Sequence, residues 1–333
     1  MEVVLAMEAR YYEKLEEQNV QCHLCPHECT IADGKTGFCN VRRNSGGTLE
    51  ATTYGKVAAA GMDPIEKKPL YHFLPGTQIL SLGQAGCTFH CDFCQNYHML
   101  TPDIRQMELS PEKAVGMAGQ KKSASIAYTY NEPYVGFEYV VDTARLAREE
   151  GLKNVLVTNG YYMSEPFDEL APLTDAMNID LKSMDDEFYR EYSHGEIAPV
   201  KRTIEEALRR GIHVELTNLL ITGLNDSEED VRDLVDYVVG LSAEIPLHLS
   251  RYHPAYKMSR AATPEDVMKR AYRIASEKLD YVYLGNIVGA GGTDTKCPDC
   301  GEVVVSRSGF RADISGLDGN RCAQCGTELN FVI

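Results

Sequence analysis

The sequence predicts an α/β fold in which a partial or near-complete parallel (β/α) barrel carries a cysteine-rich segment at each end. Over residues 77–288, short apolar segments alternate with helical patterns, and such alternation implies a parallel sheet. About seven such units, without a second glycine-rich dinucleotide fingerprint, point to a barrel or partial barrel. We therefore expect an N-terminal extension with a four-cysteine metal knuckle at 1–76, the barrel at 77–288 and a C-terminal zinc ribbon at 289–333.

The composition limits the classes of function. With 333 residues, 44% of them hydrophobic, the chain is long enough to bury a full core. Its net charge of −16 argues against nucleic acid or an anionic membrane as the main partner, because neutralising phosphates needs a basic face. No run of about 18 apolar residues and no signal peptide is visible, so we expect neither a membrane span nor secretion. All eleven cysteines have metal-binding spacing, which indicates a reducing, cytoplasmic environment.

The N-terminal extension is expected to begin with a short amphipathic helix over residues 1–18, where charged residues become frequent after Met7. A four-cysteine group follows, formed by Cys22, Cys25, Cys29 and Cys39. A CxxC pair with two further thiols close by suits a compact site with four thiolate ligands. Zinc and a second iron–sulfur cluster both satisfy this ligand set.

The barrel segment divides into recurring strand and helix patterns. Strands are predicted at 79–82, 125–130, 154–158, 176–181, 213–220, 246–250 and 280–284. Helices are predicted at 111–121, 134–150, 164–171, 201–210, 226–240 and 263–277. In a parallel barrel of this kind the active face lies at the carboxyl ends of the strands.

A CxxxCxxC run follows the first predicted strand of the barrel and consists of Cys87, Cys91 and Cys94, with Phe93 just before the last thiol. Three closely spaced thiolates without a nearby fourth can hold three irons of a cubane cluster and leave the last iron open to an outside ligand. A structural zinc site is the alternative, but such sites use four closed ligands. The pattern favours a 4Fe–4S cluster.

The C-terminal segment carries two CxxCG knuckles, which follow the flexible, glycine-rich residues 289–292. The first knuckle supplies Cys297 and Cys300, and the second supplies Cys322 and Cys325. This paired spacing predicts a zinc ribbon, in which each knuckle gives two thiolates to one tetrahedral ion. Because four thiolates close the coordination sphere, the role we expect is structural or partner docking rather than catalysis.

Polar residues stand at the ends of several predicted strands, where a barrel would bring them together. They are Asn131 and Glu132, Thr158 and Asn159, Asp180 and Lys182, Asn218, and Arg251 with His253. Each one alone is commonly a loop cap or a solvated charge, and this interpretation is favoured for Asn218 and Arg251. Together they indicate a bound polar ligand.

These motifs resemble those of a known superfamily. The CxxxCxxC run with Phe93, followed by a glutamate motif at residues 130–133, is similar to the radical S-adenosylmethionine (radical SAM) superfamily. The tripeptides at 158–160 and 180–182 and the Tyr-His pair at 252–253 resemble the activating enzymes of pyruvate formate-lyase. The whole chain resembles a narrower branch, the AmmeMemoRadiSam-system radical SAM enzymes, through CxLCPHxC, DPIEKKPLYHFLPG, GCTFHCDFCQN, TYNEP and YLGNIVGAGGTDTKCPDCG.

The resemblance implies a catalytic centre in which Cys87, Cys91 and Cys94 ligate a 4Fe–4S cluster whose open iron binds S-adenosylmethionine. It further implies that Glu132 accepts the amino group of this cofactor and that Lys182 faces its carboxylate. The rest of the cofactor would be held by Asp180, Thr158, Asn159 and His253. One departure concerns the double-glycine glutamate motif of the activating enzymes, which is here Tyr130-Asn131-Glu132-Pro133.

The implied activity is that of an oxidoreductase-like enzyme. It would reductively cleave S-adenosylmethionine to a 5'-deoxyadenosyl radical, which abstracts hydrogen from an unidentified substrate. The implied partners are a low-potential electron donor of the ferredoxin or flavodoxin type and a protein substrate or partner proteins of the same system. Two alternatives stay open: an activase that installs a glycyl radical on a partner enzyme, and a non-catalytic iron–sulfur protein for electron transfer or scaffolding.

Overall fold

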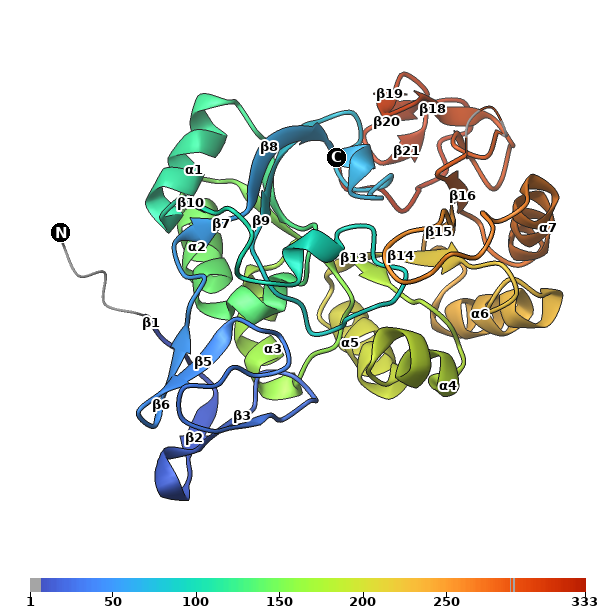
Figure 1. Cartoon of the computed structure of the whole chain (residues 1–333). Helices are drawn as coiled ribbons and strands as arrows, with labels where there is room; N and C mark the ends of the chain where they lie inside the picture. Colours follow the sequence, from blue (N-terminus) through green and yellow to red (C-terminus); the bar gives the residue numbers. More distant parts are fainter. Residues whose placement is uncertain (1–6, 288, 290) are drawn as a thin grey trace.

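The structure, a computed structural model, describes residues 7–287, 289 and 291–333 and is centred on an eight-stranded sheet (Figure 1). The strand order is β16-β15-β14-β13-β12-β11-β9-β8. Neighbouring strands from β9 to β16 are parallel, and the edge strand β8 (Ala59–Pro64) pairs antiparallel with β9. Within the described residues β8 and β16 do not pair, so the sheet is open. The predicted α/β fold with a mainly parallel sheet is confirmed, without closure into a complete barrel.

The seven predicted strands and six predicted helices are present close to their expected bounds. The parallel strands are β9 (Gln78–Gly83), β11 (Ser125–Tyr128), β12 (Lys153–Thr158), β13 (Ala176–Asp180), β14 (His213–Leu220), β15 (Leu247–Arg251) and β16 (Val282–Gly285). The helices are α1 (Pro111–Gln120), α2 (Phe137–Glu149), α3 (Ser164–Leu170), α5 (Ile197–Arg209), α6 (Glu228–Leu241) and α7 (Glu265–Ser276). A short helix α4 (Asp186–Phe188), which continues into a π-helix at Tyr189–Ser193, was not predicted.

Capping residues set the starts of two of these helices. Ser110 accepts a hydrogen bond from the backbone of Lys113, with Pro111 at the first helical position of α1. In α6, Ser227 and Asp230 form a reciprocal capping box. These contacts satisfy backbone N–H groups that a helix N-terminus leaves without partners.

Both faces of the sheet are buried, and successive residues of a strand point alternately into the core on one face and the core on the other. In β9, Leu80 belongs to the large core shared with the helices, whereas Ile79 belongs to a second core on the other face. That second core is completed by the segment before β9, through Ile65, Leu70 and Phe73. Because β8 pairs with β9 and this segment packs against the sheet, residues that precede the domain boundary predicted at 76 belong to the same core. The three-domain division stays a prediction.

The helix expected at the N-terminus is wrong for the described part of residues 1–18, and residues 1–6 lie outside the described residues. The segment instead forms β1 (Met7–Glu8), β2 (Tyr12–Lys14) and a short 3-10 turn, with Tyr11 in the left-handed backbone region at φ 56°. The charged residues pair in register with later strands, which outweighs their helical propensity. Two small sheets result, β1-β6-β5 and β2-β3-β4. Their other strands are β3 (Val20–Cys22), β4 (Thr30–Ile31), β5 (Arg42–Ser45) and β6 (Thr48–Ala51).

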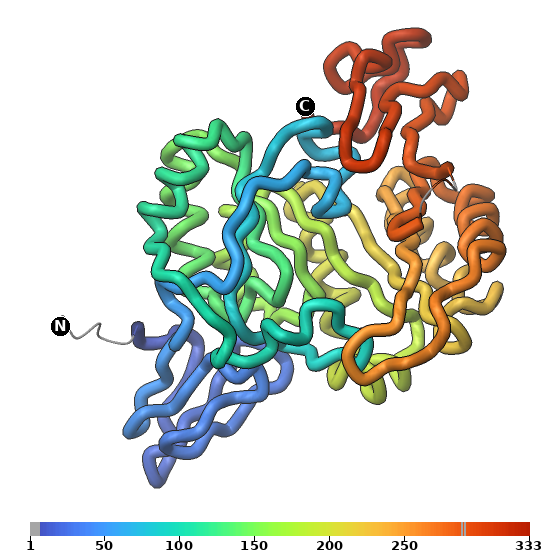
Figure 2. The backbone as a smooth tube through the Cα atoms, turned by 45° about the horizontal axis from the view of Figure 1, so that its top comes forward, coloured from blue at the N-terminus to red at the C-terminus, as the bar shows by residue number. Residues whose placement is uncertain are grey.

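The two cysteine-rich ends of the chain lie at opposite ends of the parallel strands (Figure 2). We call these two sides of the sheet the carboxyl edge and the amino edge. The N-terminal strands lie at the carboxyl edge, beside the loop after β9, where His27 Nε2 is 2.7 Å from the carbonyl oxygen of Thr88. The C-terminal segment lies at the amino edge, where Val332 forms a bridge with Phe73. Its strands are β17 (Thr295–Lys296), β18 (Val303–Ser308), β19 (Arg311–Asp313), β20 (Leu317–Asp318) and β21 (Arg321–Cys322). A separate short pair joins β7 (Lys56–Val57) to β10 (Met107–Glu108).

In the part of the chain that the structure describes, no helix combines the length and apolar character that crossing a membrane requires.

The buried side chain of Arg307 fastens the C-terminal segment to the sheet. Its guanidinium donates to the carbonyl oxygens of Tyr71 and Thr293 and to Thr295 Oγ1, at 2.7–3.0 Å, and lies 4.1 Å from the centre of the Tyr71 ring. We predict that Arg307→Met lowers the free energy of unfolding by about 2–3 kcal/mol, because buried acceptors lose a charged donor. Thermal unfolding measures this effect. The exposed Arg311→Met on the same segment is the control, and equal loss in both variants would contradict the assignment.

Candidate functional site

The loop that carries Cys87, Cys91 and Cys94 begins directly after β9, at the carboxyl edge of the sheet. Cys91 is buried, and the other two thiols are partly exposed. Gly86, at φ +89°, allows the loop to pass close to the N-terminal segment, since a Cβ there would lie 2.6 Å from the carbonyl oxygen of Cys39. The predicted placement of the three cysteines at the carboxyl edge therefore agrees with the structure.

Hydrogen-bond donors surround the sulfur of Cys87. Asn159 Nδ2 lies 3.7 Å from this sulfur and also donates to Thr88 Oγ1 at 2.9 Å, while the backbone N–H of Phe89 donates to the sulfur at 3.4 Å. Burial raises the pKa of Cys87 well above its ordinary value, and burial raises the pKa of Cys94 to about 11. Thiols with raised pKa values stay protonated at neutral pH unless a positive charge compensates the thiolate. An iron cluster would supply this charge.

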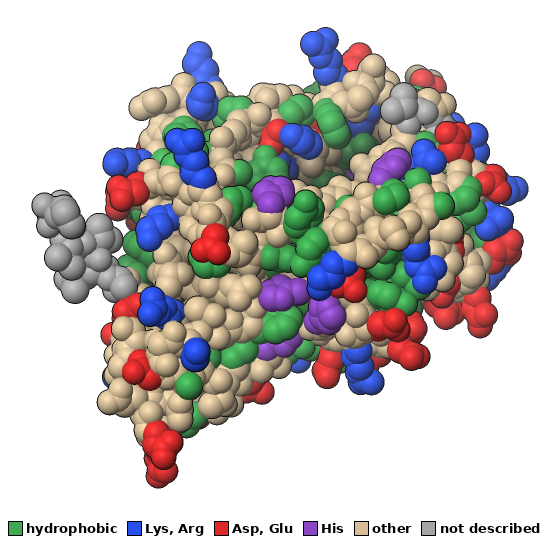
Figure 3. All heavy atoms as spheres, in the orientation of Figure 1, with side chains coloured by type: hydrophobic (Ala, Val, Ile, Leu, Met, Phe, Trp, Pro, Cys, Tyr) green, Lys and Arg blue, Asp and Glu red, His purple; other side chains and the backbone are tan. Residues whose placement is uncertain are grey.

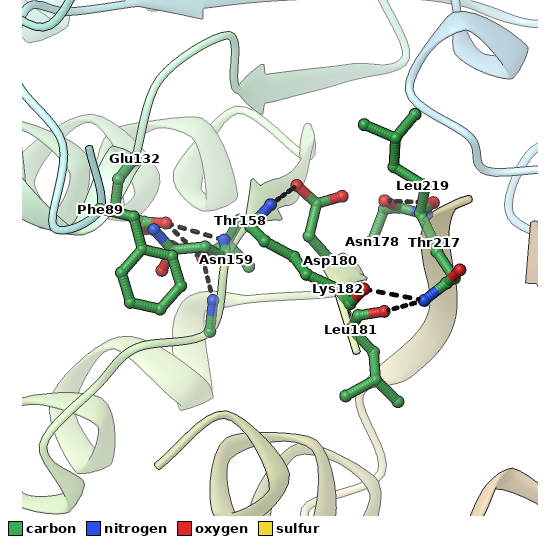
Figure 4. Close-up of polar contacts among 12 residues, drawn as sticks. Phe89, Glu132, Thr158, Asn159, Asn178, Asp180, Leu181, Lys182, Thr217 and Leu219 are labelled. Atoms are coloured by element: carbon green, nitrogen blue, oxygen red, sulfur yellow. Dashed lines mark hydrogen bonds and ion pairs between the residues drawn. The ribbon is translucent and has the colours of Figure 1, made fainter. Parts of the chain in front are cut away.

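The carboxylate of Glu132 is buried and connects the loops after β11 and β12 (Figure 4). It accepts hydrogen bonds from Thr158 Oγ1, the backbone N–H groups of Asn159 and Tyr134, and Tyr162 OH, at 2.8–3.2 Å. Burial raises the pKa of Glu132 to about 7, and these donors partly oppose the shift. The hydroxyl of Tyr162 has one proton, which goes either to Glu132 or to Thr158 Oγ1 at 2.7 Å, so three donors hold the carboxylate and Tyr162 reaches a further acceptor position.

Asp180 and Lys182 form an ion pair at the end of β13, with Nζ and Oδ2 separated by 2.8 Å (Figure 4). Burial opposes the charge on Lys182, but the neighbouring Asp180 and Cys91 raise its pKa above the ordinary value. The ammonium group is therefore charged at neutral pH. It also lies 5.9 Å from the centre of the Phe93 ring, inside the cysteine loop. A positive charge thus lies beside the cysteine loop, close enough to affect Cys91 and Cys94.

The other predicted residues have different contacts, and Asn131 and Asn218 bond the backbone beside Cys87 and Lys182. His253 is exposed after β15, with Nε2 3.5 Å from the carbonyl oxygen of Asn286. Asn218 donates to the carbonyl oxygen of Leu181, and Arg251 donates to that of Thr263, so both hold loops. Asn131 likewise donates to the carbonyl oxygen of Gly86. These contacts agree with the loop-cap interpretation of Asn218 and Arg251.

Two residues of the site had not been predicted from the sequence. Tyr162 OH lies 2.7 Å from Thr158 Oγ1 and 3.2 Å from Glu132 and donates its proton to one of them. Its position just after the 158–160 tripeptide was a signal that sequence analysis could have used. Ser193 lies in the π-helix, and its buried Oγ has no hydrogen-bond partner among the described residues. Burial raises the pKa of Cys91, and the charge of Lys182 partly opposes the shift. π-helical turns are common at functional sites, but no feature of the local sequence indicated one here.

The C-terminal cysteines have the geometry of a site for one metal ion. Cys297 and Cys325 have sulfurs 3.6 Å apart, those of Cys300 and Cys322 are 3.7 Å apart, and all four lie within 4.8 Å of one another. Zinc–sulfur bonds of about 2.3 Å in a tetrahedron place the sulfurs about 3.8 Å apart. No other three cysteines, histidines or carboxylates among the described residues come within 4.8 Å of one another.

The N-terminal cysteines, Cys22, Cys25, Cys29 and Cys39, surround a small cavity beside the Cys87 loop. Aromatic rings connect the two places, because Phe38 stacks on His90 with ring centres 4.1 Å apart and contacts His27 at 4.3 Å. In Figure 3 several histidine side chains gather near the middle of the face shown, among hydrophobic side chains. The two sets of cysteines are thus neighbours.

Comparisons with known proteins agree with this geometry. The family model described as Radical SAM superfamily matches residues 82–238. An uncharacterised protein of Methanocaldococcus jannaschii is 43% identical over 98% of this chain and 99% of its own length. The pyruvate formate-lyase-activating enzyme of Clostridium pasteurianum is 24% identical over 54% of this chain and 76% of its own length. A radical SAM methyltransferase from Sphaerobacter thermophilus has a similar fold, with a TM-score of 0.52 and 18% identity over 66% of this chain and 69% of its own.

The separation of the metal sites generates a prediction about metal content. Cys300→Ala should remove one tightly bound zinc ion and lower the melting temperature, because a structural metal contributes directly to folding free energy. Cys91→Ala should lower the iron content and leave the zinc content unchanged. Elemental analysis of anaerobically purified protein measures both. Loss of iron in Cys300→Ala with normal zinc would contradict the assignment of these cysteines.

Proposed function

The chain belongs to the radical SAM superfamily, and from this membership we propose that it is an enzyme that reductively cleaves S-adenosylmethionine and removes hydrogen from an as yet unidentified substrate. The bound cluster and cofactor would supply the 5'-deoxyadenosyl radical that carries out this step. The observation that carries the proposal is the position of the CxxxCxxC loop at the carboxyl edge, beside the Asp180–Lys182 pair and the Glu132 network. The protein's own residues have separate tasks there.

Cys87, Cys91 and Cys94 would hold three irons of the cluster. Their sulfurs are not all within 4.8 Å of one another, which is wider than a single tetrahedral ion requires and suits three ligands on three different irons. Asn159 and the backbone N–H of Phe89 donate toward the sulfur of Cys87 and stabilise its thiolate form.

Lys182 would pair with the carboxylate of the cofactor. Its ammonium group is held by Asp180 at 2.8 Å and lies next to the cysteine loop, so its orientation is already fixed before the cofactor binds. Asp180 is the more exposed partner and would accept a second hydrogen bond from a ligand.

Glu132 would act as a positioning residue in this account. Thr158 and the backbone N–H groups of Tyr134 and Asn159 donate to its carboxylate, and through them it fixes Thr158 and Asn159 against Thr88 and Cys87. The amino group of the cofactor would compete with Tyr162 OH for the acceptor position that remains. His253 would contact the cofactor only from the far part of the carboxyl edge, since it follows β15.

A narrower candidate is an activase that installs a glycyl radical on a partner enzyme. The similarity to the pyruvate formate-lyase-activating enzyme of Clostridium pasteurianum favours it, because 54% of this chain is matched. The four-cysteine segments at both ends lie outside residues 82–238, which the superfamily model matches. They would therefore have functions other than the cleavage of S-adenosylmethionine. We propose zinc for the C-terminal site, with a structural or partner-docking role, and a ferredoxin or flavodoxin type of protein as the electron donor.

The central experiment is anaerobic reconstitution with iron, sulfide and a low-potential reductant, followed by measurement of 5'-deoxyadenosine by liquid chromatography. We expect formation by the wild-type protein and none by Cys91→Ala, since this thiolate holds one iron of the cluster. Cys300→Ala serves as the control and should retain the reaction. No 5'-deoxyadenosine from fully loaded protein, even with cell extract supplied, would overturn the proposal.

Replacing Lys182 tests how the cofactor is held. Lys182→Met should weaken the binding of S-adenosylmethionine about 10- to 100-fold, because a hydrogen bond between charged groups contributes about 1.5–3 kcal/mol. Equilibrium binding to the reconstituted protein, with iron content measured in parallel, gives this number. Lys113→Met, an exposed change on α1, should bind normally. Normal affinity in Lys182→Met with full iron content would contradict the assigned role.

A further inference from the structure

The N-terminal group of four cysteines encloses a cavity whose lining is almost entirely apolar apart from the thiols. Cys22 and Cys39 are buried, and Cys25 and Cys29 are partly exposed. The remaining lining residues are Leu24, Ile31, Gly37, Phe38, Arg42, Thr88 and Val135. Four thiols that converge on one enclosed space form a closed ligand set, with no position left for a substrate.

Four thiolates can bind either one zinc ion or one 4Fe–4S cluster, and the distances between the sulfurs distinguish these two alternatives. No three of them lie within 4.8 Å of one another, whereas all four sulfurs of the C-terminal site do. One zinc ion would require separations of about 3.8 Å. In a cubane cluster each thiolate binds a different iron, so the sulfurs stand farther apart around a larger body. The wider arrangement with a cavity between the thiols fits the cluster.

Arg42 provides a second, independent observation. Its side chain is only 1% exposed and lines the cavity, and its Nη2 donates to both carboxylate oxygens of Glu138 at 2.8 Å. Nη1 donates to the carbonyl oxygen of Arg10 at 3.2 Å, whereas Nε is buried and has no hydrogen-bond partner among the described residues. A buried donor of this kind is costly unless it is paired. A sulfide or thiolate of a cluster in the cavity would accept it.

We propose that Cys22, Cys25, Cys29 and Cys39 hold a second 4Fe–4S cluster, closed by four thiolates, directly beside the first cluster site. Thr88, which follows the cluster ligand Cys87, also lines the N-terminal cavity. Because all four irons have protein ligands, this cluster exchanges electrons and does not bind S-adenosylmethionine. The inference extends the proposed function, and its test does not require cofactor cleavage.

The test uses the full chain with Cys87, Cys91 and Cys94 all changed to Ala, reconstituted anaerobically with iron and sulfide. We expect about four iron and four acid-labile sulfide per chain, with about one zinc from the C-terminal site. Mössbauer spectra should show a cubane cluster that does not change when S-adenosylmethionine is added. About two zinc with no labile sulfide, or only about two iron, would overturn the proposal.

A matched variant with Cys22→Ala and Cys25→Ala removes the other ligand set and should lower the iron content from about eight to about four. In the reduced wild-type protein, electron paramagnetic resonance should show spin coupling between neighbouring clusters, which disappears in either variant. A wild-type spectrum equal to the sum of the two variant spectra would contradict their adjacency. If the matched variant does not fold, the triple variant and the wild-type spectrum still decide the question.

Discussion

The arrangement of the candidate site depends on one buried carboxylate. Glu132 gathers donors from the turn that follows it and from the loop after β12, and it thereby joins two neighbouring strand ends. Asn159 extends the connection to Thr88 and to the sulfur of Cys87 on the loop after β9. A buried carboxylate is stable only when its oxygens accept hydrogen bonds, so the hydrogen bonds of this network form together or not at all. Three consecutive strands of the sheet thus present one rigid surface to the cluster ligands.

The cysteine groups lie at the two opposite ends of the parallel strands. The carboxyl edge carries the CxxxCxxC loop and the N-terminal cysteines, which contact each other through His27, Phe38 and His90. The amino edge carries the C-terminal site, which Arg307 and the bridge between Phe73 and Val332 fasten to the sheet. The distances between the sulfurs differ in the same way. Among the cysteines that the structure describes, only the four C-terminal thiols are close enough together to bind one ion. In this account redox chemistry belongs to one edge and structural support to the other.

The sequence predicted all seven parallel strands of the central sheet and every cysteine group, because hydrophobic periodicity and ligand spacing are local patterns. It did not predict β8 or the N-terminal strands, whose partners are distant in the chain and whose short segments show no clear period. The involvement of Arg42 could not be predicted either, since it depends on a buried pair with Glu138 about a hundred residues away. The role of Glu132 was expected from resemblance as a cofactor contact. That role stays a prediction, and the hydrogen bonds that hold its carboxylate could not be read from the sequence, because they join the turn after Glu132 to the loop after β12.

The central claim is that the CxxxCxxC cluster has an open iron that binds S-adenosylmethionine. The most direct measurement is Mössbauer spectroscopy of protein enriched in an iron isotope, recorded with and without S-adenosylmethionine, with Cys22 and Cys25 changed to Ala so that only this cluster contributes. The account predicts that the signal of one iron site changes on binding while the others do not. An unchanged spectrum in a fully loaded cluster at saturating S-adenosylmethionine would contradict it.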